Sequence, residues 1–260
     1  MLVSPKIEPV SQPRLLAVGD SAWTIEFGDR IDPLINARVM GLTGSLVTAR
    51  ETGDEPLLSA VVDVVPTFRS VTVHFDPLVA DPDQLGQRLL SLAQTSGLAA
   101  RHGRHWRLPV CFEGDLAPDL DRVAGACGLG RDEVVALMSS TAFRVYMIGF
   151  MPGFPYMGGL PAVLNVPRLA SPRKRVPARA LAIAGEMCAV YPWESPGGWN
   201  LIGRLPLPLF AARAEPPALL AAGDVVEWQV IDHATYQELE QALGKGDFDA
   251  SRFLVSGETS

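Results

Sequence analysis

The chain has 260 residues, 48% of them hydrophobic and 20% charged, and this composition excludes an intrinsically disordered or collagen-like protein. Its formal net charge of −7 argues against nucleic acid as a partner, because proteins that bind a phosphate backbone usually display positive charge. No stretch approaches the roughly 20 apolar residues that cross a bilayer, and the N-terminus lacks an apolar signal segment. We therefore expect a cytoplasmic protein that binds neither a membrane nor a nucleic acid.

Two strand pairs and two helices are predicted for the first part of the chain. Apolar residues recur at helical spacing over residues 35–47 and 85–92. The β-rich runs are residues 14–18, 22–27, 61–65 and 70–75. The resulting order, ββαββα, predicts a small α+β domain in which the helices cover one face of an antiparallel sheet.

A polar, basic stretch ahead of Trp106 marks the expected domain boundary, which gives one domain over residues 1–104 and a second over 105–260. The second domain is expected to be a β-barrel with long ordered loops, because residues 149–208 hold 10 of the 22 prolines and 8 of the 24 glycines. Its expected helices are residues 120–127, 132–139, with Asp132 as the N-terminal cap, and 234–243. Its expected strands are residues 106–112, 143–148, 181–184, 189–191 and 225–231.

The familiar catalytic motifs are absent from the sequence. It contains no phosphate-binding loop, no dinucleotide fingerprint, no H-E-x-x-H and no G-x-S-x-G elbow. Its three cysteines form no C-x-x-C pair, and its four histidines are scattered. The residues therefore identify no catalytic nucleophile or base, and we expect no metal site.

Two loops are candidates for a small-molecule site. The first, residues 149–159, alternates aromatic residues with glycine and proline, so a stiff backbone could approach a ligand closely while aromatic faces cover it. The second, residues 195–199, could present consecutive backbone N–H groups to an anion. The alternative is that both are rigid corners of the barrel. The candidate residues are Phe150, Pro152, Gly153, Phe154, Tyr156, Ser195, Gly197, Gly198 and Trp199.

A basic segment lies between these loops. Residues 134–185 contain no acidic residue and six basic ones. Within them Arg168 and Arg173 each stand beside a proline, which suits a planar two-point grip on a carboxylate or phosphate. The alternative is a solvated basic loop or a docking face for an acidic partner.

Three segments in order are distinctive: GFMPGFPYMGGLP from Gly149, PRLASPRKRVPA from Pro167 and SPGGWNLIGRLP from Ser195. With IEFGD from Ile25, they resemble the 5-oxoprolinase B subunit family (PxpB), also called KipI or allophanate hydrolase subunit 1. The resemblance covers nearly the whole chain. It implies an α+β protein in which a small N-terminal α/β sandwich domain precedes a cyclophilin-like β-barrel.

The resemblance also implies partners and a cofactor. Members work with a homologous second subunit, the 5-oxoprolinase C subunit or KipA type, and with a LamB/YcsF-type protein. Together they open 5-oxoproline to glutamate in an ATP-dependent reaction. Because this chain has no nucleotide-binding motif, we expect ATP to act on a partner or in a composite site, and the isolated chain to be inactive.

Two other roles of this family stay open. Relatives form a carboxyltransferase domain in urea carboxylase and allophanate hydrolase systems, and a Bacillus relative inhibits a histidine kinase. A non-catalytic regulatory binding protein is therefore the main alternative to an enzyme subunit.

Several positions depart from the family pattern. Met138 and Phe143 stand where histidine and tyrosine are expected, Arg179-Ala180 replaces Gly-Ser, and Met187-Cys188-Ala189 replaces Gln-Thr-Gly. Several of these changes remove hydrogen-bonding groups that a polar substrate would use. We expect the family assignment to hold, while the exact substrate stays open.

Overall fold

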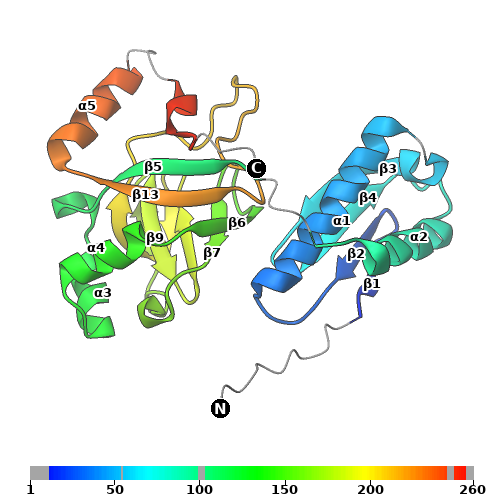
Figure 1. Cartoon of the computed structure of the whole chain (residues 1–260), viewed down its shortest axis with the longest axis horizontal. Coiled ribbons are helices and arrows are strands. Elements are labelled where there is room, and N and C mark those ends of the chain that lie inside the picture. Colours follow the sequence, from blue (N-terminus) through cyan, green and yellow to red (C-terminus); the bar gives the residue numbers. More distant parts are fainter. Residues whose placement is uncertain (1–11, 54, 99–102, 245–248, 256–260) are drawn as a thin grey trace. The chain divides into compact units, whose positions relative to one another are not determined.

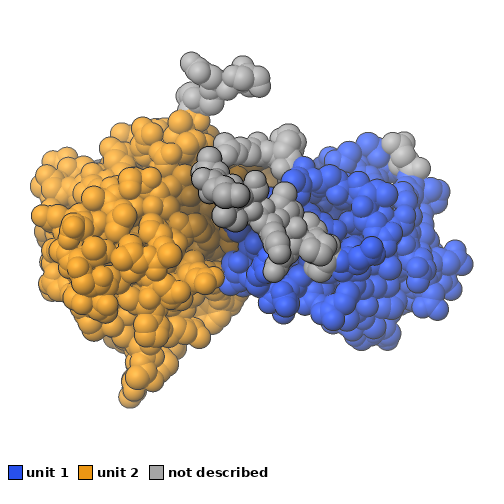
Figure 2. All heavy atoms as spheres, turned by 60° about the horizontal axis from the view of Figure 1, so that its bottom comes forward, with its two compact units in different colours: residues 1–101 blue, residues 102–260 orange. Residues whose placement is uncertain are grey.

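The computed structural model describes residues 12–53, 55–98, 103–244 and 249–255. The chain divides into two compact units, residues 1–101 and 102–260, which Figure 2 shows in blue and orange. The boundary expected between residues 104 and 105 lies close to residues 99–102, which are outside the described residues, and it stays a prediction.

Unit 1 confirms the expected ββαββα order (Figure 1). Its four strands form an antiparallel sheet in the order β1-β2-β4-β3. Helices α1 and α2 pack on the sheet and on each other, and the core lies between the helices and the strands. The elements are β1 (Arg14–Ala17), β2 (Ala22–Glu26), α1 (Pro33–Thr52), a 3-10 helix (Pro56–Ala60), β3 (Val61–Pro66), β4 (Ser70–Phe75) and α2 (Pro82–Thr95).

Local sequence signals set the ends of α1. The Asp32 carboxylate accepts hydrogen bonds from the backbone N–H groups of Leu34 and Ile35, and Pro33 occupies the first helical position. Gly53 ends the helix with a φ of 67°, in the left-handed region that glycine tolerates best. Between these ends, the apolar face that includes Val39 is buried against the sheet.

Unit 2 is built on a closed barrel of seven strands in the order β10-β7-β6-β13-β5-β12-β9, and this confirms the predicted fold class. All neighbouring strands are antiparallel except β5 and β13, which run parallel. The strands are β5 (His105–Cys111), β6 (Phe143–Ile148), β7 (Pro155–Gly158), β8 (Arg173–Val176), β9 (Ala180–Ala184), β10 (Met187–Val190), β11 (Ser195–Gly197), β12 (Asn200–Arg204) and β13 (Val225–Ile231). The helices are α3 (Leu120–Cys127), α4 (Arg131–Ser139) and α5 (His233–Gly244), with 3-10 helices at Gly114–Leu116, Ala162–Leu164 and Ala250–Phe253.

A buried carboxylate fastens the start of the parallel pair. Asp224 is 2% exposed and accepts hydrogen bonds from the Arg104 guanidinium, the Trp106 indole and the backbone N–H of Ala221. A buried charge is tolerated when it is paired and fully hydrogen-bonded. The hydrogen bonds of Asp224 therefore hold the start of β5 beside the start of β13, although about half the chain separates the two strands.

Two details of unit 2 differ from expectation. Asp132 does not cap α4: the N-cap is Gly130, whose N–H donates to the Glu133 carboxylate at 2.6 Å, because the helix begins one residue earlier than expected. The Pro- and Gly-rich segment 149–208 is not only loops. Besides β9 and β10, which lie near the two expected strands, it contains β7, β8, β11 and β12, each three to five residues long. Of these, β8 and β11 form a separate two-stranded sheet.

Three departures from the family pattern lie in the barrel core. Met138, Phe143 and Cys188 are each 0% exposed and belong to one hydrophobic cluster. The ring of Phe143 packs 5.9 Å from that of Trp228. The interior at these positions is therefore apolar, and these side chains pack the barrel rather than line a surface site.

Arg179 occupies a backbone conformation that favours glycine. Its φ is 68°, and a side chain in this left-handed region costs roughly 1–2 kcal/mol. Its guanidinium donates to the carbonyl oxygen of Pro206 at 2.7 Å and pairs with Glu240 on α5. Arg179 therefore connects the barrel to α5 while its own backbone is strained.

A comparison of two variants isolates this strain. Arg179→Gly and Arg179→Ala both lose the contacts to Pro206 and Glu240, but only glycine relaxes the backbone. We expect Arg179→Gly to be more stable than Arg179→Ala by about 1 kcal/mol in denaturant unfolding. Equal stabilities would show that the positive φ carries no strain.

Candidate functional site

The first candidate loop is the turn of the β6–β7 hairpin. Within it the Gly149 N–H donates to the carbonyl oxygen of Phe154 at 3.1 Å, and the Phe154 N–H donates to that of Met151 at 3.1 Å. Gly153 has a φ of 76°, and a Cβ there would lie 2.8 Å from Phe210. Hydrogen bonds within the turn therefore hold its backbone in one conformation, and position 153 accepts only glycine without strain.

Phe150 is the unusual residue of this turn. Its φ is 68° and its side chain is 67% exposed. A non-glycine residue in the left-handed region is uncommon, and such strain concentrates at functional sites. The turn therefore holds an aromatic ring in solvent at an energetic cost.

Behind Phe150 the aromatic side chains form a continuous cluster. Phe154 is 2% exposed, and its ring centroid lies 5.5 Å from that of Phe150, 4.8 Å from Tyr156 and 5.1 Å from Tyr191. The Trp199 ring completes the cluster at 5.9 Å from Tyr156. Tilted and edge-to-face packing of this kind is favourable beyond the area it buries. The two candidate loops therefore meet through their aromatic residues.

The second candidate loop wraps around the hydroxyl group of Tyr191. A Cβ on Gly197 would lie 2.3 Å from it, and the backbone of Trp199 acts to lower the pKa of this phenol. The buried Oγ of Ser195 has no hydrogen-bond partner among the described residues.

The two candidate arginines have different surroundings. Arg168 is exposed and makes no hydrogen bond or ion pair with the part of the chain that the structure describes. It acts electrostatically on the phenols of Tyr156 and Tyr191. Burial raises the pKa of both phenols although Arg168 opposes it, so both hydroxyls are protonated at neutral pH and can donate a hydrogen bond.

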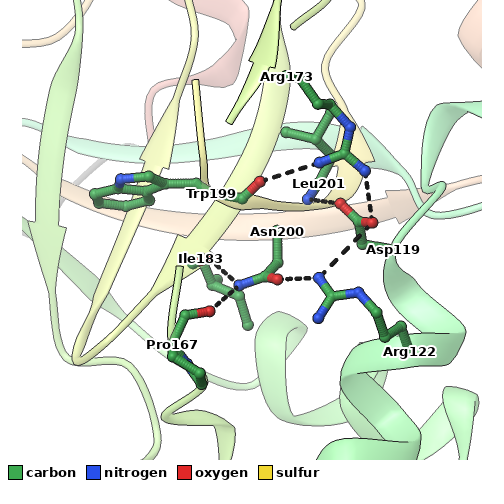
Figure 3. Close-up of polar contacts among 8 residues, drawn as sticks. All are labelled: Asp119, Arg122, Pro167, Arg173, Ile183, Trp199, Asn200 and Leu201. Atoms are coloured by element: carbon green, nitrogen blue, oxygen red, sulfur yellow. Dashed lines mark hydrogen bonds and ion pairs between the residues drawn. The ribbon is translucent and has the colours of Figure 1, made fainter. Parts of the chain in front are cut away.

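Arg173, by contrast, is held by a buried carboxylate (Figure 3). Its Nη2 lies 2.7 Å from Oδ1 of Asp119, which is 5% exposed, and its Nη1 lies 3.5 Å from the carbonyl oxygen of Trp199. The second oxygen of Asp119 accepts the N–H of Leu201 at 2.7 Å. Asp119 thereby joins the start of α3 to β8 and β12.

Asn200 extends the same network. It is 0% exposed, and its amide nitrogen donates to the carbonyl oxygens of Pro167 at 3.0 Å and Ile183 at 2.9 Å. Its amide oxygen accepts from the guanidinium of Arg122 on α3, as Figure 3 shows. Every polar group of this buried amide therefore has a partner that fixes the segment beside Trp199.

Sequence reasoning missed Asp119, Arg122, Asn200 and Tyr191. Asp119 directly precedes α3, where an acidic residue is usually a helix cap, yet its side chain makes no capping bond. The contacts that reveal its role join residues 54 and 82 positions apart in the chain. The structure brings the predicted aromatic residues of the two loops together and places Arg173 on Asp119, while binding by any of these residues stays a prediction.

The described residues supply no activated thiol. Burial raises the pKa of Cys111, Cys127 and Cys188, which keeps the thiols protonated and unreactive. Among the residues that the structure describes, no group of three or more histidine, cysteine, aspartate or glutamate side chains is placed to hold a metal ion. No described helix is both long enough and apolar enough to cross a membrane.

Comparison with known proteins shows which class of protein this chain belongs to. A family model described as the carboxyltransferase domain, subdomain C and D, matches residues 13–220. The urea amidolyase of Kluyveromyces lactis has the same fold, with a TM-score of 0.73 at 20% identity over 96% of this chain and 17% of that one. The barrel unit and its N-terminal unit are thus a carboxyltransferase-type protein.

Two further relatives narrow the assignment. The 5-oxoprolinase B subunit of Bacillus subtilis (strain 168) is 33% identical over 238 residues, which cover 86% of this chain and 95% of the relative. The solved structure of TTHA0988 has a TM-score of 0.69 at 33% identity over 81% of this chain, which spans 40% of that longer chain. The chain therefore belongs to the 5-oxoprolinase B subunit family, as the sequence motifs predict.

Removal of the Asp119 charge tests the network. Asp119→Ala leaves the buried N–H of Leu201 without an acceptor and removes the ion-pair partner of the partly exposed Arg173, so we expect a loss of about 2 kcal/mol in the free energy of unfolding. Asp119→Asn keeps an acceptor for Leu201 and should lose about half as much. In the control, Arg175→Gln breaks an exposed pair with Glu194 and should leave the unfolding midpoint unchanged. Equal effects of Asp119→Ala and Arg175→Gln would contradict a structural role for Asp119.

Phe150 should matter little for stability. Phe150→Gly removes an exposed ring and relaxes a positive φ, so we expect the free energy of unfolding to stay within about 0.5 kcal/mol of the parent. Phe154→Ala empties a buried position and should lose about 3 kcal/mol. If Phe150→Gly is as damaging as Phe154→Ala in thermal or denaturant unfolding, the exposed ring supports the fold rather than an external contact.

Proposed function

We propose that this chain is the B subunit of an ATP-dependent complex of the 5-oxoprolinase type, which opens 5-oxoproline, or a related small amide or lactam, to glutamate or the corresponding product. Membership of the family and the environment of Arg168 support this proposal. Arg168 is an exposed guanidinium without a hydrogen-bond or ion-pair partner among the described residues, and its charge lowers the pKa of the phenols of Tyr156 and Tyr191, which burial raises.

These groups suit the chemistry of a small cyclic amide that carries a carboxylate. Arg168 would bind the carboxylate through two parallel N–H···O bonds. The faces of Phe150 and Tyr156 would cover the flat ring. The phenol hydroxyl of Tyr156 would donate to the amide carbonyl oxygen, where negative charge develops when the ring is attacked. Arg173 already has Asp119 as its partner, so we assign the carboxylate to Arg168 alone.

The same arrangement supports the need for partners. The described residues offer no activated nucleophile, and the sequence has no phosphate-binding loop. ATP activation would therefore belong to a homologous second subunit of the C or KipA type, to a LamB/YcsF-type protein, or to a composite site. The greater length of TTHA0988, of which this chain spans 40%, is in keeping with a larger functional unit.

A non-catalytic regulatory role is the second candidate, and one observation favours it. Met138, Phe143 and Cys188 make the barrel interior apolar. These three side chains therefore offer no strong hydrogen-bonding group that could take part in a reaction. A regulator of this kind would bind a small anion or a protein without turning it over.

Reconstitution with the two partner proteins distinguishes these roles. We expect ATP-dependent 5-oxoproline opening by the complex and none by the isolated chain. Arg168→Gln should raise KM for 5-oxoproline about tenfold or more, with a smaller change in kcat, because a charge-assisted contact to the substrate is lost. The KM of Arg168→Lys should lie between those of the parent and of Arg168→Gln, since lysine keeps the charge but not the planar pair of N–H donors.

The control is Arg213→Gln, which removes the same charge from an exposed position outside the two candidate loops. It should leave KM unchanged. A complex that forms but has no activity on 5-oxoproline would favour the regulatory role. An active complex whose KM is the same in all variants would remove Arg168 from the site.

A further inference from the structure

Two arginines from different elements approach the same carboxylate oxygen. Nη2 of Arg173, on β8, lies 2.7 Å from Oδ1 of Asp119, and Nη2 of Arg122, on α3, lies 3.7 Å from it. Two positive groups thus share one negative one, and the three side chains together carry a net charge of about +1 at neutral pH. Like charges this close repel each other unless more negative charge is supplied.

The neighbouring acidic residues do not supply that charge. Among the described residues, the only ion-pair partner of either arginine is Asp119. Asp121 on the same helix pairs with Arg131, and Glu194 pairs with Arg175. The excess positive charge at Arg122 and Arg173 is therefore left to the solvent or to a bound anion.

Both guanidinium groups have donors to spare and are held in position. A guanidinium carries five N–H donors, and the hydrogen bonds described here use only some of those on Arg122 and Arg173. The buried side chain of Asp119 holds the guanidinium group of Arg173, and the buried side chain of Asn200 holds that of Arg122. The arginine side chains are still 48% and 29% exposed, so an anion can reach them from solvent.

We propose that Arg122 and Arg173 form a binding site for a phosphate group, either free phosphate or the phosphate of a nucleotide. A phosphate carries close to two negative charges at neutral pH and has several acceptor oxygens, so it can bridge two guanidinium groups. A carboxylate has only one charge and is matched by one arginine. The Trp199 ring points away from this network in Figure 3. The site uses neither Arg168 nor an aromatic ring as a contact, so the proposal stands whether or not the proposed reaction does.

Calorimetric titration of the full chain with inorganic phosphate, and separately with ADP, tests the site. We expect saturable binding by the parent protein and about tenfold weaker binding by Arg122→Gln. Arg122→Lys should be intermediate. Arg175→Gln, which removes the same charge from an exposed position of β8, should bind like the parent. Arg173 is left unchanged, because its loss would strip Asp119 of its partner.

A second measurement does not depend on heats of binding. Phosphate should raise the unfolding midpoint of the parent and of Arg175→Gln, but not of Arg122→Gln, because a ligand that binds the native state stabilises it. If ADP binds more tightly than phosphate and both depend on Arg122, the source is a nucleotide; if phosphate binds at least as tightly, it is the free ion. No saturable phosphate binding, or equal weakening by Arg122→Gln and Arg175→Gln, would overturn the proposal.

Discussion

The buried carboxylate of Asp119 is the interaction on which the candidate region depends. It meets a guanidinium from β8 and a backbone N–H from β12, and it stands at the start of α3. These elements are far apart in the chain, and two of them are short strands that have little internal stability. One desolvated charge therefore sets the spacing of segments that propensity alone would leave loose, and a charge in such a place is stable only while every partner is present.

This constraint explains how a segment rich in proline and glycine can be well defined. Proline and glycine set turns but give few hydrogen bonds along the chain. Hydrogen bonds between side chains and the backbone compensate for this: Asn200 donates to two carbonyl oxygens, and Asp119 accepts the N–H of Leu201. The result is a surface made of loops whose backbone is held by buried side chains.

The sequence predicted elements whose signal is local and missed those whose signal is not. Helix α2 and strand β13 have clear local patterns: β13 has the expected bounds, and α2 extends three residues beyond the expected range at each end. Strands β8 and β11 are only four and three residues long and pair with each other across a long gap, so no window of sequence reveals them. In the site, the aromatic residues and arginines were visible by type. Asp119 was not, because an acidic residue before a helix looks like a cap until its distant partners are known.

The parallel pairing of β5 with β13 has a consequence for synthesis on the ribosome. Each residue of β5 is matched to one 120 positions later, from His105 with Val225 to Cys111 with Ile231. The barrel cannot close until its last strand has left the exit tunnel, and pairings between distant segments form slowly. The strand pairings of unit 1 all lie within residues 14–75, so this unit can fold while unit 2 is still being made. Until β13 has emerged, β5 and its apolar neighbours remain exposed without their partner strand. During this interval the nascent chain has the greatest need of a chaperone.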